Sequence, residues 1–317
     1  MALESQNFIE SGGIFTEHKN KISKENGLEN SFFKKAADKI TQEFKKHFFK
    51  SKDHLEQISS EVQDLELSVE MDGLREEAEQ IAESTLNKIS EQLGTNRGGW
   101  YENTDTNEKY YIKFYENFDQ ARAEFIANAI YDKLGINAAK SKFTNVEGEH
   151  AIASSEVLGA EGVYHDELKQ SADVKNGFIA DAYLANWDVV GLVYDNIVKS
   201  SDGKMYRIDN GGALTFRAQG QAKEFSPNDI PELENMMNLD YPTGQVFSGL
   251  SMQELKLQAQ HLVDTLKQKD INKIIAESGM EGDQAEIIRE GLIGRLKFIQ
   301  EQFKVSPAEI KYSEQVQ

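Results

Sequence analysis

Three side chains whose oxygen atoms can bind a cation or a proton stand at the ends of expected secondary structure between residues 177 and 220. Asp188 follows an apolar helical run, Asn196 directly precedes a strand-like run, and Asp209 directly follows a second one. Hard divalent cations prefer oxygen ligands, and a carboxylate that holds no metal can orient a nucleophilic hydroxyl group. The three residue types therefore suit a site that binds a divalent cation and activates a nucleophile.

The segment between the two strand-like runs, residues 197–199 and 205–208, contains Ser-Ser-Asp-Gly, a sequence typical of a tight turn. A β-hairpin over these residues would bring Asp188, Asn196 and Asp209 to one end of the paired strands.

Two alternatives stay open at this site. Asp195 could replace Asn196 as a metal ligand or take the catalytic role, and the sequence Asp195-Asn196 is also typical of a plain turn that opens a strand. Asp188 could equally form a local hydrogen bond at the end of its helix.

A lysine and a glutamate form a second candidate pair. Lys113 lies in the strand-like run YYIKFY, and a helix is expected to follow, with Asn117 at its start, Gly135 at its end and Glu124 beside its apolar face. Glu124 could turn inward toward Lys113. The pair is then either a surface ion pair of little energy or a lysine held on nucleotide phosphates by a glutamate of the helix.

Glycines precede this pair in the chain. Gly94, Gly98 and Gly99 lie ahead of and at the start of the expected strand before Lys113, where backbone amides can approach a phosphate closely. A turn into a hairpin would use the same glycines.

The composition excludes several classes of function. With 39% apolar residues, the 317-residue chain can bury a substantial core, and its net charge of −19 argues against binding of nucleic-acid backbones. The absence of cysteine excludes disulfides and thiolate catalysis, and the six histidines lack metal-ligand spacing. The start of the chain carries no secretory signal, and no apolar run reaches the ~20 residues that span a bilayer. We therefore expect a cytoplasmic protein without a transmembrane segment.

The order of helical and strand-like patterns predicts an α+β protein with two lobes. We expect a flexible arm over residues 1–30, a helical extension over 31–93, a small β-rich lobe over 94–159, a mainly helical lobe over 160–305 and a polar tail over 306–317. In the extension, apolar residues at helical spacing continue to Leu86 and Ile89. The chain is expected to cross between the lobes at Glu156-Val157-Leu158-Gly159.

One basic stretch stands out in the acidic chain. Lysines lie beside the apolar stripe of the first expected helix, among them Lys34, Lys35, Lys45 and Lys46. They form either the solvated face of an amphipathic helix or a docking site for an anionic ligand, such as an inositol polyphosphate, a phosphoinositide headgroup or an acidic partner.

Taken together, a glycine-bearing hairpin, a strand lysine, a helix glutamate, a crossover, Asp188, Asn196 and Asp209-Asn210-Gly211 follow one another in an order that resembles the protein-kinase superfamily. The chain resembles most the HipA-like and phosphoinositide-kinase-like atypical bacterial kinases, which include translocated effector kinases of Legionella type. The resemblance spans residues 94–303 and is carried by GGWY, YYIKFY, QARAEFIANAIYDKLGI, DAYLANWDVVGLVYDNI and RIDNGGALTFRAQG.

The resemblance implies a bilobal kinase-like fold, in which the helix after Lys113 corresponds to the helix that bears the conserved glutamate of kinases. It also implies an ATP site. Lys113, held by Glu124, would bind the phosphates of ATP, and Gly98, Gly99 and Glu156 would line the nucleotide site.

It further implies that Asp188 accepts or orients the hydroxyl group of the acceptor, while Asn196 and Asp209 bind Mg²⁺ or Mn²⁺. The chain departs from the protein-kinase pattern in three ways. Seven residues separate Asp188 from Asn196, which is a longer spacing than kinases have; no His-Arg adjoins Asp188; and Asn210 stands where kinases have Phe.

The leading hypothesis from the sequence is an ATP- and Mg²⁺-dependent phosphotransferase that acts on a hydroxyl group of a protein, a lipid or a small molecule and can phosphorylate itself. As such it would be cytoplasmic or translocated into a host cell as an effector. The alternatives are a transferase of AMP or a scaffold on the same fold, and an interaction module that binds an anionic ligand through its lysine-rich helix.

Overall fold

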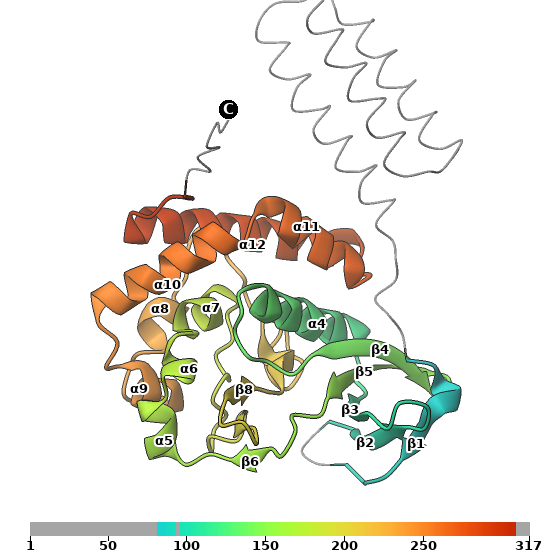
Figure 1. Cartoon of the computed structure of the whole chain (residues 1–317). Coiled ribbons are helices and arrows are strands. Elements are labelled where there is room, and N and C mark those ends of the chain that lie inside the picture. Colours follow the sequence, from blue (N-terminus) through green and yellow to red (C-terminus); the bar gives the residue numbers. More distant parts are fainter. Residues whose placement is uncertain (1–80, 93–95, 309–317) are drawn as a thin grey trace, which may run out of the picture. The chain divides into compact units, whose positions relative to one another are not determined.

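The computed structural model describes residues 81–92 and 96–308 (Figure 1). The first part of this region is a five-stranded antiparallel sheet in the order β1-β2-β3-β5-β4, with helix α4 packed against β4 and β5. Its elements are η1 (Glu83–Thr85), β1 (Leu86–Lys88), β2 (Gly98–Asn103), β3 (Lys109–Lys113), α4 (Phe118–Lys133), β4 (Ser141–Val146) and β5 (Glu149–Ser155).

Strand β3 is the centre of this sheet, and its aromatic and β-branched residues suit a strand that is paired on both sides. Its last residue, Lys113, lies opposite Gly98 of β2 and opposite Ile152 of β5. A Cβ atom on Gly98 would lie 2.2 Å from the carbonyl oxygen of Ile112. Glycine at this position therefore lets β2 approach β3 closely beside Lys113.

Helix α4 has the start and end that the sequence predicts. The side chain of Asn117 accepts a hydrogen bond from the backbone N–H of Asp119, which satisfies one of the free donors of the first turn. The chain leaves the helix through Gly135, whose φ of 67° is in the left-handed region that glycine adopts without strain.

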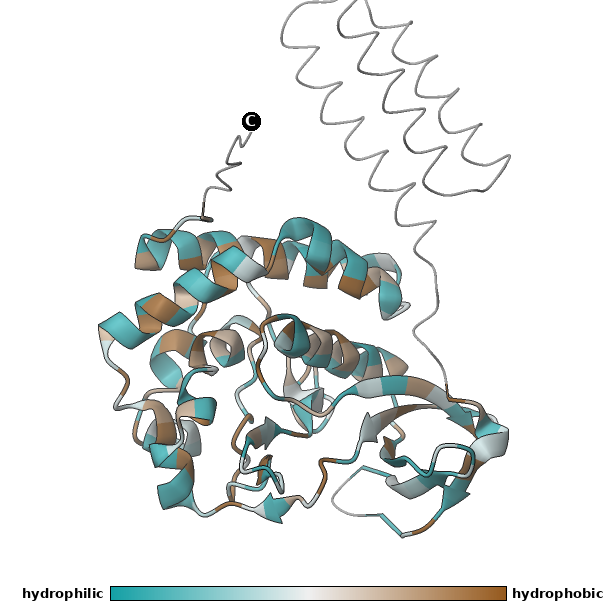
Figure 2. Ribbon diagram, viewed as in Figure 1, coloured by the Kyte–Doolittle hydropathy of each residue, from teal (hydrophilic) through white to brown (hydrophobic). Residues whose placement is uncertain are grey.

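The second part of the region is mainly helical, with one small sheet in the order β6-β7-β8. Its helices enclose the largest hydrophobic core, and α10 and α12 carry both hydrophilic and hydrophobic residues, as expected for amphipathic helices at the surface of a lobe (Figure 2). Its elements are β6 (Glu161–Gly162), α5 (His165–Gln170), α6 (Ala172–Lys175), α7 (Phe178–Tyr183), β7 (Ile197–Lys199), β8 (Met205–Arg207), η2 (Asn210–Gly212), α8 (Glu232–Asn235), α9 (Pro242–Phe247), α10 (Met252–Thr265), α11 (Gln268–Glu277) and α12 (Gly282–Phe303).

The chain passes from the first sheet to the second through residues 156–160, where the crossover was expected. The expected hairpin is present as β7 and β8, which pair from Ile197 opposite Arg207 to Lys199 opposite Met205. The α+β class with two lobes is confirmed. Within the described residues, no helix has the length and apolar character that crossing a membrane requires.

The helix expected up to residue 93 is wrong in the part that the structure describes. Residues 86–88 form β1, which pairs with residues 101–103 of β2. Leu86 and Ile89 are spaced as in a helix, but Leu86 packs against the core of the small lobe, and the N–H of Ile89 bonds to the carbonyl oxygen of Trp100. Backbone pairing with a neighbouring strand thus overrides a short helical pattern. The expected arm and the rest of the extension, residues 1–80, lie outside the described residues.

Candidate active site

A buried ion pair joins the central strand to the helix that follows it. Lys113 Nζ lies 2.6 Å from Glu124 Oε1, and the two side chains are 5% and 1% exposed. The interpretation as a surface pair is therefore wrong. Burial alone would lower the pKa of Lys113, but Glu124, Tyr115 and Asp209 together outweigh burial, and the pKa lies well above its usual value. Lys113 is thus held as a cation inside the protein.

Glu124 has a second partner that the sequence analysis did not single out. Tyr115 Oη donates a 2.7 Å hydrogen bond to Glu124 Oε2, so each carboxylate oxygen of Glu124 has its own donor. Burial raises the pKa of Tyr115 well above its usual value, which keeps its hydroxyl group protonated as the donor. The Tyr115 hydroxyl also lies against Gly211, where a Cβ atom would be 2.1 Å away. Glycine at 211 is therefore required for this contact.

Asp209 completes the group around Lys113. Its Oδ1 lies 2.9 Å from Lys113 Nζ, and the charge of Lys113 lowers the pKa of Asp209. Asp209 has a left-handed backbone (φ 54°, ψ 53°), which is uncommon for a residue with a side chain. Its carboxylate is about half exposed, at 52%, so it faces a space that a ligand can enter.

Asp188 and Asn196 contact each other directly. Asn196 Nδ2 donates to the backbone oxygen of Asp188 at 2.7 Å and to its carboxylate Oδ2 at 3.3 Å. Partial burial raises the pKa of Asp188, the negative charge of Asp209 raises it further, and the bond from Asn196 opposes both effects. A carboxylate with a raised pKa is better suited to accept a proton than an ordinary aspartate.

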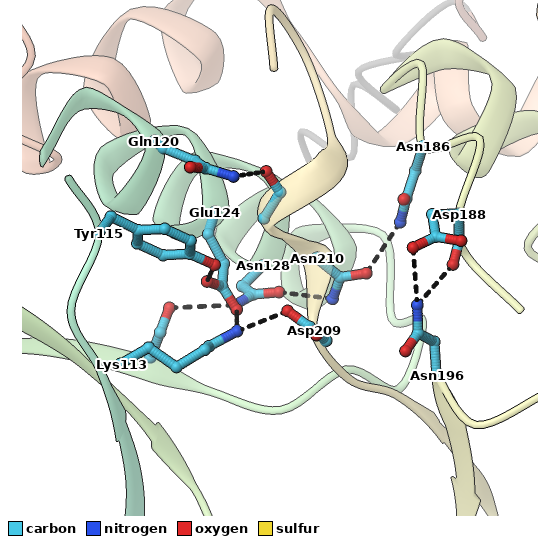
Figure 3. Close-up of polar contacts among 12 residues, drawn as sticks. Lys113, Tyr115, Gln120, Glu124, Asn128, Asn186, Asp188, Asn196, Asp209 and Asn210 are labelled. Atoms are coloured by element: carbon cyan, nitrogen blue, oxygen red, sulfur yellow. Dashed lines mark hydrogen bonds and ion pairs between the residues drawn. The ribbon is translucent and has the colours of Figure 1, made fainter. Parts of the chain in front are cut away.

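The hairpin places the two halves of the site together (Figure 3). Ile208 N–H bonds to the carbonyl oxygen of Asn196 at 2.9 Å, just beyond the last paired residues of β7 and β8. Asp209 therefore follows directly after a residue that is bonded to Asn196. Asp188, Asn196 and Asp209 thus lie at one end of the hairpin, as the sequence arrangement predicted.

At this end of the hairpin, Asp209 and Asn196 carry oxygen atoms of the kind that Mg²⁺ binds. No group of three or more His, Cys, Asp or Glu residues that could hold a metal occurs within residues 81–92 and 96–308. Asn196 uses its Nδ2 on Asp188, so its Oδ1 is the atom that can face a cation beside Asp209. Mg²⁺ is commonly held by one or two carboxylates together with substrate phosphates, which needs no larger protein cluster.

Asp195 is exposed and lies two residues before β7. Its Oδ1 occupies the space beside Gly191, where a Cβ atom would be 2.2 Å from it. Its charge contributes to the raised pKa of Asp188. It thus lies near the site, and the choice between Asp195 and Asn196 as metal ligand stays a prediction.

The other residues that the sequence predicted to bind a nucleotide or an anion lie in different parts of the chain. Gly98 lies opposite Lys113 and Gly99 follows it in β2, while residues 93–95, which include Gly94, lie outside the described residues. Glu156 begins the link between the sheets, and its N–H bonds to the carbonyl oxygen of Lys109 at 2.9 Å. The anion-binding candidates Lys34, Lys35, Lys45 and Lys46 lie outside the described residues.

A lysine that the sequence analysis missed joins the segments that carry the two aspartates. Lys223 Nζ donates to the carbonyl oxygens of Ala185 and Gly212, the latter at 2.6 Å. Ala185 lies shortly before Asp188, and Gly212 shortly after Asp209. Burial lowers the pKa of Lys223 to about 7. No motif marks this residue, because its role depends on a chain segment folding back over both loops.

The antiparallel sheet with its buried lysine, the glutamate-bearing helix and the helical lobe that carries Asp188, Asn196 and Asp209 form a bilobal α+β fold, the arrangement that the resemblance to kinases implied. No family model matches the chain, and no curated protein does. Among solved structures, the chain is similar to the crystal structure of a Helicobacter pylori proinflammatory kinase, CtkA. The similarity has a TM-score of 0.49 at 16% sequence identity and covers 72% of this chain and 96% of the other.

Proposed function

We propose that the protein is an ATP- and Mg²⁺-dependent phosphotransferase. The observation that carries this proposal is the buried Lys113–Glu124 pair, whose lysine also contacts Asp209, next to the contact between Asp188 and Asn196. Lysine, a metal-binding aspartate and asparagine, and a separate aspartate are the groups that phosphoryl transfer requires, because its catalysis consists mainly of positioning and charge neutralisation.

Each residue has a distinct role in the proposed reaction. An ammonium group has three donors, and Lys113 uses two of them on Glu124 and Asp209, so the third can bind a phosphate oxygen. Asp209 and Asn196 would hold Mg²⁺, which neutralises the phosphate charge when it is bound. Mn²⁺ has the same preference for oxygen ligands.

Asp188 would act on the acceptor. The acceptor oxygen forms a bond to the γ-phosphorus of ATP, the bond from that phosphorus to the bridging oxygen of ADP breaks, and the acceptor proton goes to the Asp188 carboxylate. The raised pKa of Asp188 favours this proton transfer at neutral pH. The acceptor hydroxyl belongs to a protein, a lipid or a small molecule, and the chain itself is one candidate acceptor.

The test is transfer of labelled γ-phosphate from ATP to the protein itself and to candidate acceptors. We expect Asp188→Asn and Asp209→Asn each to lower transfer by about 100-fold or more, which is the scale of losing a general base or a charge-stabilising group. Asp202→Asn is the matched control, because Asp202 lies in the exposed turn at the far end of the same hairpin. Full transfer by both site variants would contradict the proposal.

Mass spectrometry of the protein after incubation with ATP separates the related functions. Added phosphate supports phosphotransfer, whereas added AMP would indicate a transferase of AMP on the same site. Absence of both products, together with binding of ATP, would indicate a scaffold.

A further inference from the structure

Helix α4 turns a row of polar side chains toward the segment that follows β8. The row consists of Gln120, Glu124 and Asn128, spaced four residues apart on one face of the helix, and we call it the polar row. Gln120, Glu124 and Asn128 are 3%, 1% and 5% exposed. Polar groups of this kind are costly to bury unless they have hydrogen-bond partners, so their partners indicate what the helix holds in place.

The polar row contacts three consecutive residues of one segment (Figure 3). Glu124 reaches Asp209 through Lys113, which bonds to both carboxylates. Asn128 Oδ1 accepts a 2.8 Å bond from Asn210 Nδ2. Gln120 Nε2 donates a 2.9 Å bond to the carbonyl oxygen of Gly211. The helix therefore fixes this segment residue by residue.

Asn210 connects the polar row to the loop that carries Asp188. While its Nδ2 donates to Asn128, its Oδ1 accepts a 2.8 Å bond from Asn186 Nδ2. Asn186 stands two residues before Asp188, and Asn186 and Asn210 are both 1% exposed. The side chain at 210 thus needs a donor and an acceptor at once, which an amide has and an apolar side chain lacks.

Asn186 is itself fixed from the other side. Its Nδ2 also contacts Tyr131 Oη at 3.1 Å, and Tyr131 donates to Asp181 Oδ1 at 2.8 Å. Asp181 in turn forms two 2.7 Å bonds with the buried guanidinium group of Arg207. A buried network in which each member has its partners is rigid, because breaking one bond leaves a polar group unpaired.

We propose that Asn210 is a positioning residue that fixes Asp188 and Asp209 relative to each other and to α4. The inference rests on the proposed function, in which Asp209 binds the metal and Asp188 acts on the acceptor hydroxyl. Asn210 directly follows Asp209 in the chain and bonds to the residue two before Asp188. A shift of α4 would therefore move both carboxylates, because the amide of Asn210 bonds to α4 and to the loop that carries Asp188.

The decisive variant is Asn210→Leu, which keeps the branched shape of the side chain and removes both the donor and the acceptor. The matched control is Asn272→Leu in α11. Asn272 is also a buried amide, 3% exposed, and within the described residues neither its nitrogen nor its oxygen has a hydrogen-bond partner. The control removes a buried amide of the same lobe without touching the site.

The first measurement is the Mg²⁺ concentration that gives half-maximal binding of a fluorescent ATP analogue. Outer residues that orient metal ligands typically change metal affinity by about 10–100-fold when they are replaced. We expect Asn210→Leu to raise this Mg²⁺ concentration by about that factor and Asn272→Leu to leave it unchanged. An unchanged Mg²⁺ requirement in Asn210→Leu would overturn the inference while leaving the proposed function intact.

The double variant Asn128→Leu/Asn210→Leu separates positioning from stability. Replacing both partners of a buried hydrogen bond by apolar groups is often nearly neutral for stability. Asn186 keeps its contact with Tyr131, and the other bond that Asn128 gives up, at 3.2 Å, goes to the partly exposed Ser141. We therefore expect the melting temperature to recover relative to Asn210→Leu, while the Mg²⁺ requirement stays raised. If the melting temperature and the Mg²⁺ requirement both returned toward their wild-type values, Asn210 would have only a structural role.

The second measurement needs no nucleotide. Hydrogen–deuterium exchange of the backbone amides of residues 186–196 should be faster in Asn210→Leu than in the wild type and in Asn272→Leu, because the loop loses its bond to residue 210. Equal exchange in all three proteins would contradict the positioning role. Absence of Mg²⁺-dependent nucleotide binding in the wild type would instead contradict the proposed function, and the exchange rates would still decide the inference.

Discussion

At the scale of single residues, the two carboxylates of the site have opposite environments. The charge of Lys113 lowers the pKa of Asp209, whereas burial and the nearby charge of Asp209 raise the pKa of Asp188. Carboxylates whose environments separate their pKa values commonly have different chemical roles. Here Asp209 stays ionised as a metal ligand requires, and Asp188 is closer to the proton affinity of a base.

The raised pKa of Asp188 has a consequence for stability. A carboxyl group whose pKa is higher in the folded than in the unfolded chain stabilises the fold at low pH, and this contribution is lost as the pH rises through the folded pKa. We expect Asp188→Asn to have a melting temperature equal to or above that of the wild type at pH 7, although transfer is lost. The advantage should disappear below about pH 4, where the unfolded aspartate is protonated as well.

Thermal melts at pH 7 and below about pH 4 check this prediction. Asp202→Asn is the control, and its expected change in melting temperature has the opposite sign. The side chain of Lys204 holds the pKa of Asp202 at about 2, and Ser200 adds to this effect, so Asp202→Asn should lower the melting temperature at pH 7. A lower melting temperature of Asp188→Asn at pH 7 would contradict the view that burial and the charge of Asp209 raise the pKa of Asp188.

Lys223 gives a second pH-dependent prediction. Burial lowers its pKa to about 7, with Arg295 and Arg217 acting in the same direction and Glu232 and Asp188 against it. Between this value and the ~10.4 of an unfolded lysine, the unfolded chain binds more protons, so stability rises with pH. The free energy of unfolding of the wild type, measured with urea, should therefore increase relative to Lys223→Met between pH 7 and pH 9. A constant difference would contradict the buried position of the ammonium group.

At the scale of elements, the sequence predicted those whose pattern is local. Strand β3, helix α4 and the hairpin of β7 and β8 each have their periodicity, cap or turn residues within a few positions of the chain. Strand β1 has three residues and depends on pairing with β2, which no local pattern indicates. Its residues therefore seemed to continue a helix.

The site was predictable to the same degree. Motif order placed Lys113, Asp188 and Asp209, but whether Lys113 meets Glu124 depends on which face of β3 lies under α4. The polar row of α4 was missed for a related reason. Amphipathic patterning assigns polar residues to solvent, whereas Gln120 and Asn128 face a partner segment about 80 to 90 residues further along the chain.

The packing of α7 on β8 gives a prediction at this scale. A Cβ atom on Gly177, at the start of α7, would lie 2.0 Å from Nη2 of Arg207. The guanidinium group has no room to move, because Asp181 bonds to both Nε and Nη2 and the pair is buried. We expect Gly177→Ala to cost about 1–3 kcal/mol of unfolding free energy, as overpacking of a core does.

Urea unfolding compares this variant with Gly162→Ala, in which the added Cβ atom meets nothing within 4 Å. The control should change stability by less than about 0.5 kcal/mol, as surface substitutions usually do. Equal stability of the two variants would show that Arg207 can leave Asp181 at little cost.

At the scale of the whole molecule, helix α12 supports the loop that carries Asp188. Arg295 of α12 donates to the carbonyl oxygens of Ala182 and Tyr183 at the end of α7, and its Nη2 lies 2.5 Å from Glu232 Oε2. Glu232 Oε1 accepts a 2.9 Å bond from the indole nitrogen of Trp187, the residue before Asp188. This buried ion pair thus connects α12 to the proposed catalytic loop.

This connection predicts that Arg295→Met weakens both the fold and the site. The arginine and glutamate side chains are 1% and 4% exposed, and removing one partner of a buried pair typically costs about 3–5 kcal/mol, because the other charge stays buried. Arg289→Met on the same helix is the matched control, since Arg289 pairs with the exposed Glu286 and should contribute less than about 1 kcal/mol. Urea unfolding measures both costs. Tryptophan fluorescence, recorded in a Trp100→Phe background in which Trp187 is the one tryptophan of the sequence, reports whether the indole of Trp187 leaves Glu232. We expect this fluorescence to shift in Arg295→Met under native conditions and to stay unchanged in Arg289→Met. Equal unfolding free energies for the two variants would mean that α12 does not support the loop.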